Sequence, residues 1–310
     1  MNVLFVDHSF HRRTKSADFF LRILKSCFAV KTFYYDRCYQ CGIPQGMVDW
    51  ADLVVYWEFL PGRYKLAHEG KKCVFVPMYD NEWGSFWQWK RIAWSGMGVV
   101  SFCDKVTEHA RCCGVTNILD VRYFPDPALL PQCPGDSKKV FLWKRGGITK
   151  SMVEAMFPSA AGYTFMVKGA QDFLPREQYL ERLSSCGIVI APRRKEGIGM
   201  AFLEAMAMGK CVVAYDDATM NEYIKHGETG VLFNSRELTA VDFSVVEHVR
   251  KNLSKFSVAQ FVKWQKNAQT INDFLAKQPL CRPTFENRLK RVAAYPFYLA
   301  EGAVYRLAHG

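Results

Sequence analysis

The feature that most restricts the fold is an alternation of short, apolar, β-branched runs with stretches of helical composition. In the first half of the chain, we expect strands at 2–7, 31–35, 52–57, 72–77, 98–102 and within 115–123. Helices are expected between them at 17–24 and 105–113. Strands that alternate with helices favour a parallel sheet with right-handed crossovers, so this half predicts an α/β domain.

The alternation begins again after a proline-rich segment. Residues 124–137 indicate an interdomain linker because they contain Pro125, Pro127, Pro131, Pro134 and Gly135. Beyond the linker, strands are expected at 139–143, 163–167, 187–192, 211–215 and, at the sheet edge, 230–233. Helices are expected at 149–156, 175–183, 200–208 and 221–225, and from 243 onward with breaks at Pro279, Pro283 and Pro296. A chain of 310 residues suits two such domains of about 150 residues each.

The net charge narrows the possible partners. Lysine and arginine exceed the acids by 41 − 30 = 11, and such an excess attracts anions. Nucleic acid, an anionic membrane surface and phosphorylated small molecules all qualify. No recognisable nucleic-acid-binding motif accompanies the charge, so we predict no nucleic-acid partner.

The cysteines and the N-terminus favour a reducing compartment. The sequence has 11 cysteines, and its first residues lack the basic flank and apolar length of a secretory signal. We therefore expect free thiols and a cytoplasmic protein, soluble or peripheral, because no apolar run reaches the roughly 18 residues that span a bilayer. Cys38 and Cys41 are spaced like half a zinc site, but no second half follows, so we predict no metal.

Residues 193–209 have the composition of an anion site. Three cations and an acid come first, Gly197 and Gly199 follow, and an apolar helix then runs to Gly209. The N-terminus of a buried helix binds anions through its free N–H groups and its dipole. Two acids, Glu196 and Glu204, fit such a site if the ligand also carries hydroxyl groups. A phosphate joined to sugars meets both requirements.

This region resembles the group 1 retaining glycosyltransferases of the GT-B fold. The resemblance covers 195–214, 221–224 and 227–233, with two glutamates eight positions apart in an E-G-x-G-x-x-x-x-E-A-x-A-x-G pattern. It implies an α/β GT-B fold with two Rossmann-like domains facing across a cleft. The N-terminal acceptor domain would be 1–134, joined by a C-terminal helix at about 270–310, and the nucleotide-sugar donor domain would be 135–269.

The resemblance also implies roles for residues of the donor domain. Glu196 would bind hydroxyls of the donor sugar, and Glu204 would bind the ribose hydroxyls. Backbone groups at Gly197, Ile198, Gly199 and Met200 would reach the sugar and the phosphates. Arg145 and Lys150, which have the family's spacing, would bind the diphosphate, with Lys144 as an alternative to Arg145. Cations that stabilise the leaving diphosphate make a metal unnecessary, and we predict no cofactor.

The N-terminal half departs from the family pattern. The loop after the first strand has no glycine, although His8, His11 and Arg12 lie where donor phosphate or acceptor would bind. Tyr79 and Asp80 stand where the family often has a His-Asp pair, which leaves the catalytic details and the sugar open.

Two aromatic segments raise the question of a membrane. Residues 83–94 contain four tryptophans and two cations, and residues 284–310 mix aromatic and basic side chains. Such mixtures are typical of membrane interfaces, but packing within the fold explains them equally well.

The sequence therefore predicts a retaining, metal-independent glycosyltransferase in cell-surface polysaccharide or lipopolysaccharide synthesis. It would move a sugar from a UDP- or GDP-linked donor to a saccharide or lipid-linked saccharide, in the cytoplasm or on the inner face of the membrane. The alternatives are a catalytically silent GT-B module that binds a glycan or a partner, a nucleic-acid binder, and an epimerase or phosphorylase on the same fold.

Overall fold

The computed structural model describes residues 1–36, 42–60, 70–80, 85–145, 147–169, 172 and 174–309. The chain forms two compact units, the first from Met1–Val121 with Lys266–Gly310, and the second from Arg122–Gln265. The sequence analysis had placed these boundaries at 134/135 and near 270. Residues just after 121 group with the second unit because Tyr123 packs on Trp264, with ring centroids 4.9 Å apart, and Phe124 packs on Phe256.

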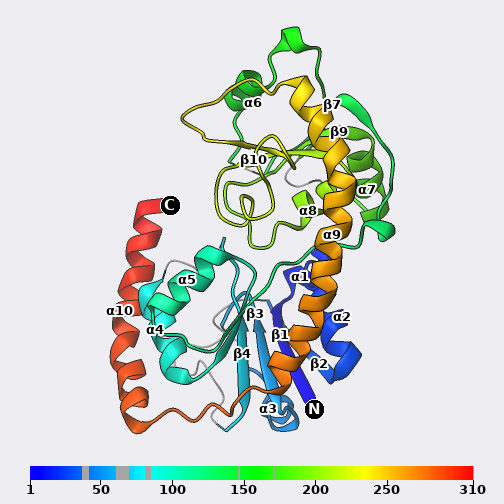
Figure 1. Cartoon of the computed structure of the whole chain (residues 1–310). Coiled ribbons are helices and arrows are strands. Elements are labelled where there is room, and N and C mark those ends of the chain that lie inside the picture. The colour runs from blue at the N-terminus through cyan, green and yellow to red at the C-terminus, as the bar shows by residue number, and fades with distance from the viewer. Residues whose placement is uncertain are drawn as a thin grey trace. The chain divides into compact units, whose positions relative to one another are not determined.

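The first unit contains a six-stranded parallel sheet in the order β2-β1-β3-β4-β5-β6 (Figure 1). Its strands are β1 (Asn2–His8), β2 (Ala29–Tyr35), β3 (Leu53–Trp57), β4 (Lys72–Val76), β5 (Gly98–Ser101) and β6 (Ile118–Asp120). Every predicted strand of this half is present. The interiors of β1, β3, β4 and β5 are buried, because both faces of a parallel sheet are covered by helices, whereas the edge strands β2 and β6 are more exposed.

The helices of the first unit are only partly those predicted from the sequence. They are α1 (Phe10–Thr14), α2 (Asp18–Cys27), α3 (Gln45–Trp50), α4 (Phe86–Ser95), α5 (Asp104–Cys112) and α10 (Phe285–His309). The sequence analysis predicted α2 and α5 but did not predict α1, α3 or α4. The α4 helix lies beside α10 (Figure 1), and Trp87 stacks on Phe297 with centroids 5.0 Å apart.

The second unit contains a five-stranded parallel sheet in the order β11-β10-β9-β7-β8. Its strands are β7 (Asp136–Trp143), β8 (Thr164–Lys168), β9 (Cys186–Ile190), β10 (Cys211–Tyr215) and β11 (Val231–Phe233). Its helices are α6 (Lys150–Met156), α7 (Arg176–Ser184), α8 (Met200–Ala207) and the 3-10 turns at Pro127–Leu129 and Ser159–Ala161. Helix α9 (Phe243–Ala276) begins in this unit and ends in the first.

Two predictions about helices were wrong. Residues 221–225 form turns rather than a helix, and Gly227, at φ +77°, reverses the chain two residues later. Pro296 does not break α10. The hydrogen bond that Pro296 cannot donate would have gone to Val292, which is exposed, so water can satisfy that carbonyl.

Every cysteine in the described part of the chain is a thiol, and Cys38, Cys41 and Trp83 lie outside the described residues. None of the helices within the described ranges is both long and apolar enough to cross a membrane.

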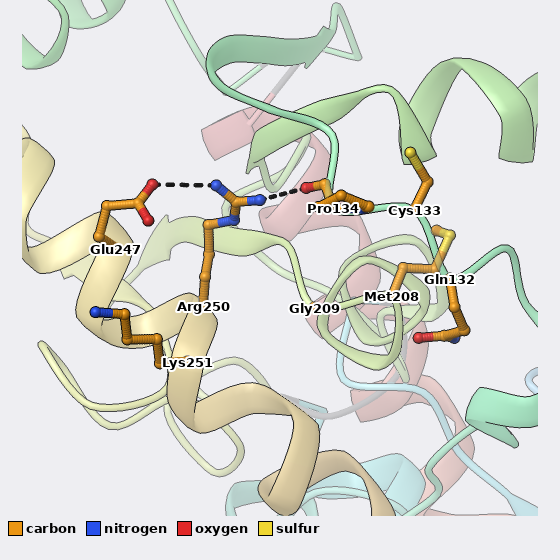
Figure 2. A pocket seen from close by; sticks show the side chains of 8 residues that line it. All are labelled: Gln132, Cys133, Pro134, Met208, Gly209, Glu247, Arg250 and Lys251. Atoms are coloured by element: carbon orange, nitrogen blue, oxygen red, sulfur yellow. Dashed lines mark hydrogen bonds and ion pairs between the residues drawn. The ribbon is translucent and has the colours of Figure 1, made fainter.

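A pocket of about 320 Å³ opens in the second unit at the amino ends of its strands (Figure 2). Gln132, Cys133 and Pro134 come before β7, and Gly209 comes before β10. Arg250 crosses the pocket between Glu247, at 3.1 Å, and the carbonyl of Pro134. Ligands of parallel α/β sheets bind at the carboxyl ends of the strands, so this pocket is not the candidate site.

Candidate active site

The candidate site of the second unit lies where the strand order reverses. From β7 the chain adds β8 on one side and then crosses to the other side for β9, so the loops after β7 and β9 leave a shared edge. Ligands of open α/β sheets bind at such a switch point. The two loops touch, because a Cβ at Gly147 would lie 3.3 Å from the backbone nitrogen of Arg194. The Tyr215 hydroxyl, at the end of β10, donates to the Gly147 carbonyl and fixes the first loop.

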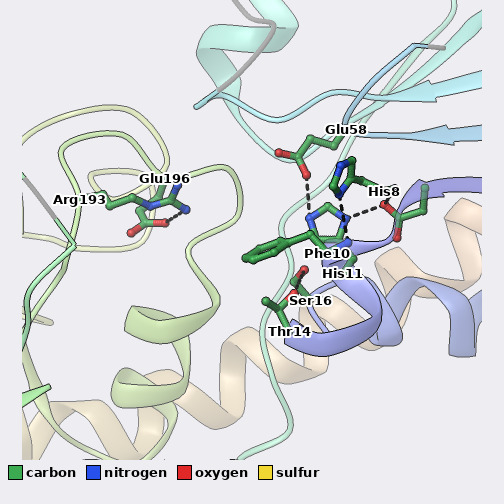
Figure 3. A network of polar contacts seen from close by, with 9 residues as sticks. His8, Phe10, His11, Thr14, Ser16, Glu58, Arg193 and Glu196 are labelled. Atoms are coloured by element: carbon green, nitrogen blue, oxygen red, sulfur yellow. Dashed lines mark hydrogen bonds and ion pairs between the residues drawn. The ribbon is translucent and has the colours of Figure 1, made fainter. Parts of the chain in front are cut away.

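Glu196 is a buried carboxylate in the loop after β9. The residue is 5% exposed, and its side chain accepts a hydrogen bond of 3.0 Å from the Arg193 guanidinium (Figure 3). Its backbone carbonyl accepts a bond of 2.9 Å from the hydroxyl of Thr219, which sits at φ +71° in the turn after β10. The position of Glu196 is therefore set by two neighbouring loops.

Gly199 begins the buried helix that the sequence predicted. Its φ of +78° is a left-handed conformation, and a Cβ there would overlap the Phe202 ring at 1.9 Å. Gly197, Ile198 and Gly199 are buried and Met200, the first residue of α8, is half-buried. Their backbone lies at the N-terminus of α8, at the end of the sheet where the sequence analysis placed the donor.

Glu204 lies on α8 and is 3% exposed. Arg176, the first residue of α7, donates two parallel hydrogen bonds of 2.6 and 2.9 Å to its two oxygens. Burial raises the pKa of Glu204, and the bonds and charge of Arg176 oppose that rise. Sequence reasoning missed Arg176; the only signal for it is its place directly after Pro175 at a helix start.

The two predicted diphosphate cations follow β7. Lys150 is the first residue of α6, and its side chain is 90% exposed and lies 3.5 Å from Glu154. The guanidinium of Arg145 lies 4.7 Å from the centre of the Trp143 ring. The structure thus gathers Arg145, Lys150 and the two glutamates at one end of one sheet, and their binding roles stay predictions.

The first unit has a switch point of its own, between β1 and β3. His11 in α1 bridges two carboxylates there: Nδ1 lies 2.5 Å from Asp7, at the end of β1, and Nε2 lies 2.8 Å from Glu58, directly after β3 (Figure 3). Burial alone would lower the pKa of His11, but the bonds and charges of Asp7 and Glu58 outweigh it and raise that pKa to about 9. At neutral pH the ring is therefore an imidazolium between two carboxylates. Glu58, at φ +65°, is the residue that sequence reasoning missed here.

The predicted residues His8 and Arg12 contact other groups than His11 does. His8 accepts a bond of 3.0 Å from the Phe10 backbone and its Nε2 lies 3.1 Å from the Asp36 carbonyl, whereas Arg12 is exposed with its guanidinium 5.4 Å from the centre of the Tyr34 ring.

Tyr79 is buried, with its hydroxyl accepting a 3.1 Å hydrogen bond from Lys105, and Asp80 follows it, half-buried. Tyr79 is 1% exposed, and its role at the site stays a prediction.

Within the described ranges, no group of three or more His, Cys, Asp or Glu side chains is arranged to hold a metal ion.

Comparisons with known proteins bear on the second unit and on the fold. Residues 170–244 match the family model of group 1 glycosyl transferases. A curated relative is the N,N'-diacetylbacillosaminyl-diphospho-undecaprenol alpha-1,3-N-acetylgalactosaminyltransferase of Campylobacter jejuni. It is 28% identical over 116 residues, which cover 36% of this chain and 31% of that protein. The match therefore spans about a third of the relative's length.

Solved structures resemble the chain over most of its length. Anabaena HepE, solved in complex with UDP and glucose, has a TM-score of 0.59 at 13% identity and covers 89% of this chain and 99% of its own. Sucrose-phosphate synthase from Thermosynechococcus elongatus has a TM-score of 0.61 at 12% identity, covering 89% and 98%. At such identities the likeness establishes the fold alone.

The two parallel sheets and these likenesses define a GT-B protein. Within that fold, the match to the group 1 glycosyl transferase family model is confined to residues 170–244 of the second unit.

Proposed function

We propose that the chain is a retaining glycosyltransferase that takes a sugar from a nucleotide-sugar donor. The observation that carries the proposal is the pair of buried carboxylates, Glu196 and Glu204, at the switch point of the second sheet. Carboxylates accept hydrogen bonds from hydroxyl groups, and a nucleotide sugar has hydroxyls at both of its ends. The cationic loop after β7 adjoins them and suits the diphosphate between.

The chemistry follows from these roles. As the bond between the anomeric carbon and the diphosphate oxygen breaks, negative charge grows on the leaving group, and Arg145 and Lys150 stabilise that charge without a metal ion. The acceptor hydroxyl attacks the same face of the sugar, which retains the anomeric configuration. Its proton passes to the leaving diphosphate, so no protein nucleophile is needed.

We propose UDP or GDP as the nucleotide and a lipid-linked saccharide as the acceptor. Support comes from a structural relative solved with UDP and from a curated relative whose name specifies a diphospho-undecaprenol-linked sugar. A product of this kind would belong to polysaccharide or lipopolysaccharide synthesis in the cytoplasm.

We also propose that α10 attaches the protein to the membrane that holds such an acceptor. One face of α10 packs on α4, where Glu301 accepts hydrogen bonds from Ser85 and from the Phe86 backbone. The opposite face carries an apolar stripe, 49% to 75% exposed, formed by Phe285, Leu289, Val292 and Leu299. Their spacing puts them on one side of the helix, and the exposed cations Arg282 and Arg288 suit anionic headgroups.

The test is to measure turnover with a panel of UDP- and GDP-sugars. Turnover is detected as release of the nucleoside diphosphate. Glu196→Ala and Lys150→Ala are each expected to lower turnover by about a hundredfold or more, because each removes charge or hydrogen bonding at the reacting bond. Glu154→Ala is the matched control, since it removes the partner of Lys150 and keeps the cation. Folded variants with wild-type turnover would refute these roles, and a wild-type protein that binds neither UDP nor GDP would favour the silent module.

A further inference from the structure

Lys168 is a buried lysine at the same end of the second sheet as the candidate site. It is the last residue of β8, is 6% exposed, and lies opposite Trp143 of β7 in the strand register. Its Nζ lies 3.9 Å from the centre of the Trp143 ring, and the guanidinium of Arg145 lies 4.7 Å from the same ring. Two cations therefore lie against the same indole ring, that of Trp143.

The ammonium of Lys168 has no hydrogen-bond acceptor or ion-pair partner among the described residues. Asp172 acts on it through its charge, but that carboxylate accepts a bond of 2.7 Å from the backbone N–H of Gly169. The Trp143 indole N–H is likewise buried and has no acceptor within the described part of the chain. Neither donor therefore has a side-chain or backbone acceptor among the described residues.

A purely structural role accounts poorly for Lys168. A contact between a cation and an aromatic ring stabilises only weakly, whereas burying most of a charged side chain without an ionic partner is unfavourable. Burial lowers the pKa of Lys168, Asp172 opposes that effect, and the nearby charge of Arg145 adds to it. An uncharged side chain of similar length would fill the space at lower cost, so the charge itself needs another explanation.

We propose that Lys168 is a third cation for the donor, which binds a phosphate oxygen of the nucleoside diphosphate together with Arg145. The inference rests on the proposed function and deepens it. A phosphate oxygen between the two cations would supply the acceptor that the ammonium lacks. The Trp143 N–H could serve the same anion.

Calorimetric titration of UDP, GDP and the matching nucleosides tests this role in the full-length protein. Lys168→Met is expected to weaken binding of the nucleoside diphosphate about tenfold to a hundredfold, as for loss of a hydrogen bond to a charged group. Binding of the nucleoside should stay within about twofold, because its phosphate is absent. The melting temperature should be unchanged or higher, since a buried charge is removed.

Lys138→Met is the matched control. Lys138 is on β7, the strand next to β8, near its amino end, and its Nζ also lies over a ring, 5.6 Å from the centre of Phe243. Its replacement should leave nucleotide affinity unchanged.

Three results would overturn the inference. If the wild type binds UDP or GDP and Lys168→Met binds it equally well, Lys168 is no phosphate ligand and the proposed function stands. If Lys168→Met lowers the melting temperature and weakens nucleoside and diphosphate alike, its role is structural. If the wild type binds no nucleoside diphosphate, the proposed function itself fails.

Discussion

The pairing of Arg176 with Glu204 has a direct consequence for stability, because Glu204 is a buried carboxylate with two hydrogen bonds from one guanidinium. Arg176→Ala should lower the free energy of unfolding by about 1–2 kcal/mol, a value reduced from that of a fully buried pair because the Arg176 side chain is 56% exposed. In a Glu204→Gln background the same change should cost much less. Urea unfolding of the four proteins measures the coupling, and equal costs in both backgrounds would show that the pair contributes nothing.

The position of His11 between the carboxylates of Asp7 and Glu58 predicts that the stability of the protein depends on pH. The pKa of His11 is raised from 6.5 to about 9, so the folded protein binds its proton more tightly than the unfolded chain does. Its contribution, at most about 3 kcal/mol, is complete below pH 6.5 and is lost as the pH rises through 9. The difference in stability between wild type and His11→Gln should therefore shrink between pH 6.5 and 10. Thermal melts of both proteins across that range measure this difference. A difference that is constant with pH would contradict the raised pKa of His11.

The site residues differ in how far the sequence could predict them. Glu196, Gly199 and Glu204 were predictable from residue type and spacing, since they lie within one short segment. Arg176, Glu58 and Lys168 were not, because their partners are 28, 47 and 25 residues away and meet them only through the sheet order.

At the scale of elements, buried strands were the most predictable part. The 11 strands found in the described ranges all overlap segments that the sequence analysis had identified, although β7 begins at Asp136, inside the expected linker. Helices α1 and α3 are too short to show the apolar periodicity that marks a helix, and α4 carries aromatic residues on its exposed as well as its buried face, which obscures that periodicity in the sequence. Contacts with other parts of the chain stabilise these helices. For example, the first turn of α4 is capped by Ser85 and by Glu301, which lies near the end of the chain.

The start of α8 gives a prediction at this scale. Gly199→Ala should destabilise the protein by more than about 2 kcal/mol and weaken donor binding, because it adds overlap with Phe202 to the cost of a left-handed backbone. Gly209→Ala is the matched control: its φ is +70° and nothing lies within 4 Å of the added Cβ, so about 1 kcal/mol is expected. Urea unfolding of both variants separates the overlap with Phe202 from the cost of the left-handed backbone. Equal losses in the free energy of unfolding would mean that the Phe202 ring moves away at little cost.

At the scale of the whole molecule, each unit has a switch point lined by charged loops, and the chain carries a net charge of +11. Sequence alone predicted the two α/β halves, which the structure confirms, and an anionic ligand, which stays a prediction. It left open whether the aromatic segments pack or adsorb to a membrane, because both uses require the same residues. In the structure, Trp89 is buried and Trp87 packs on α10, so the remaining question concerns the exposed stripe of α10.

Replacement of three stripe residues tests the membrane proposal. The variant with Phe285→Ser, Leu289→Ser and Val292→Ser should bind vesicles that contain phosphatidylglycerol at least about tenfold more weakly, because the apolar area available for insertion is lost. Val258→Ser with Val262→Ser is the control, since it removes exposed apolar residues from α9 instead. Co-sedimentation measures binding. Equal binding of the stripe variant and the wild type, or no binding of either, would refute attachment through α10.

The central claim is that Glu196 and Glu204 bind opposite ends of one nucleotide sugar. Calorimetric titration of the donor found in the panel, and of its nucleoside diphosphate, tests that division most directly. We predict that Glu196→Gln weakens binding of the nucleotide sugar about tenfold but leaves the nucleoside diphosphate within about twofold, whereas Glu204→Gln weakens both about tenfold. If both variants bind both ligands as tightly as the wild type does, the account of the donor site is wrong.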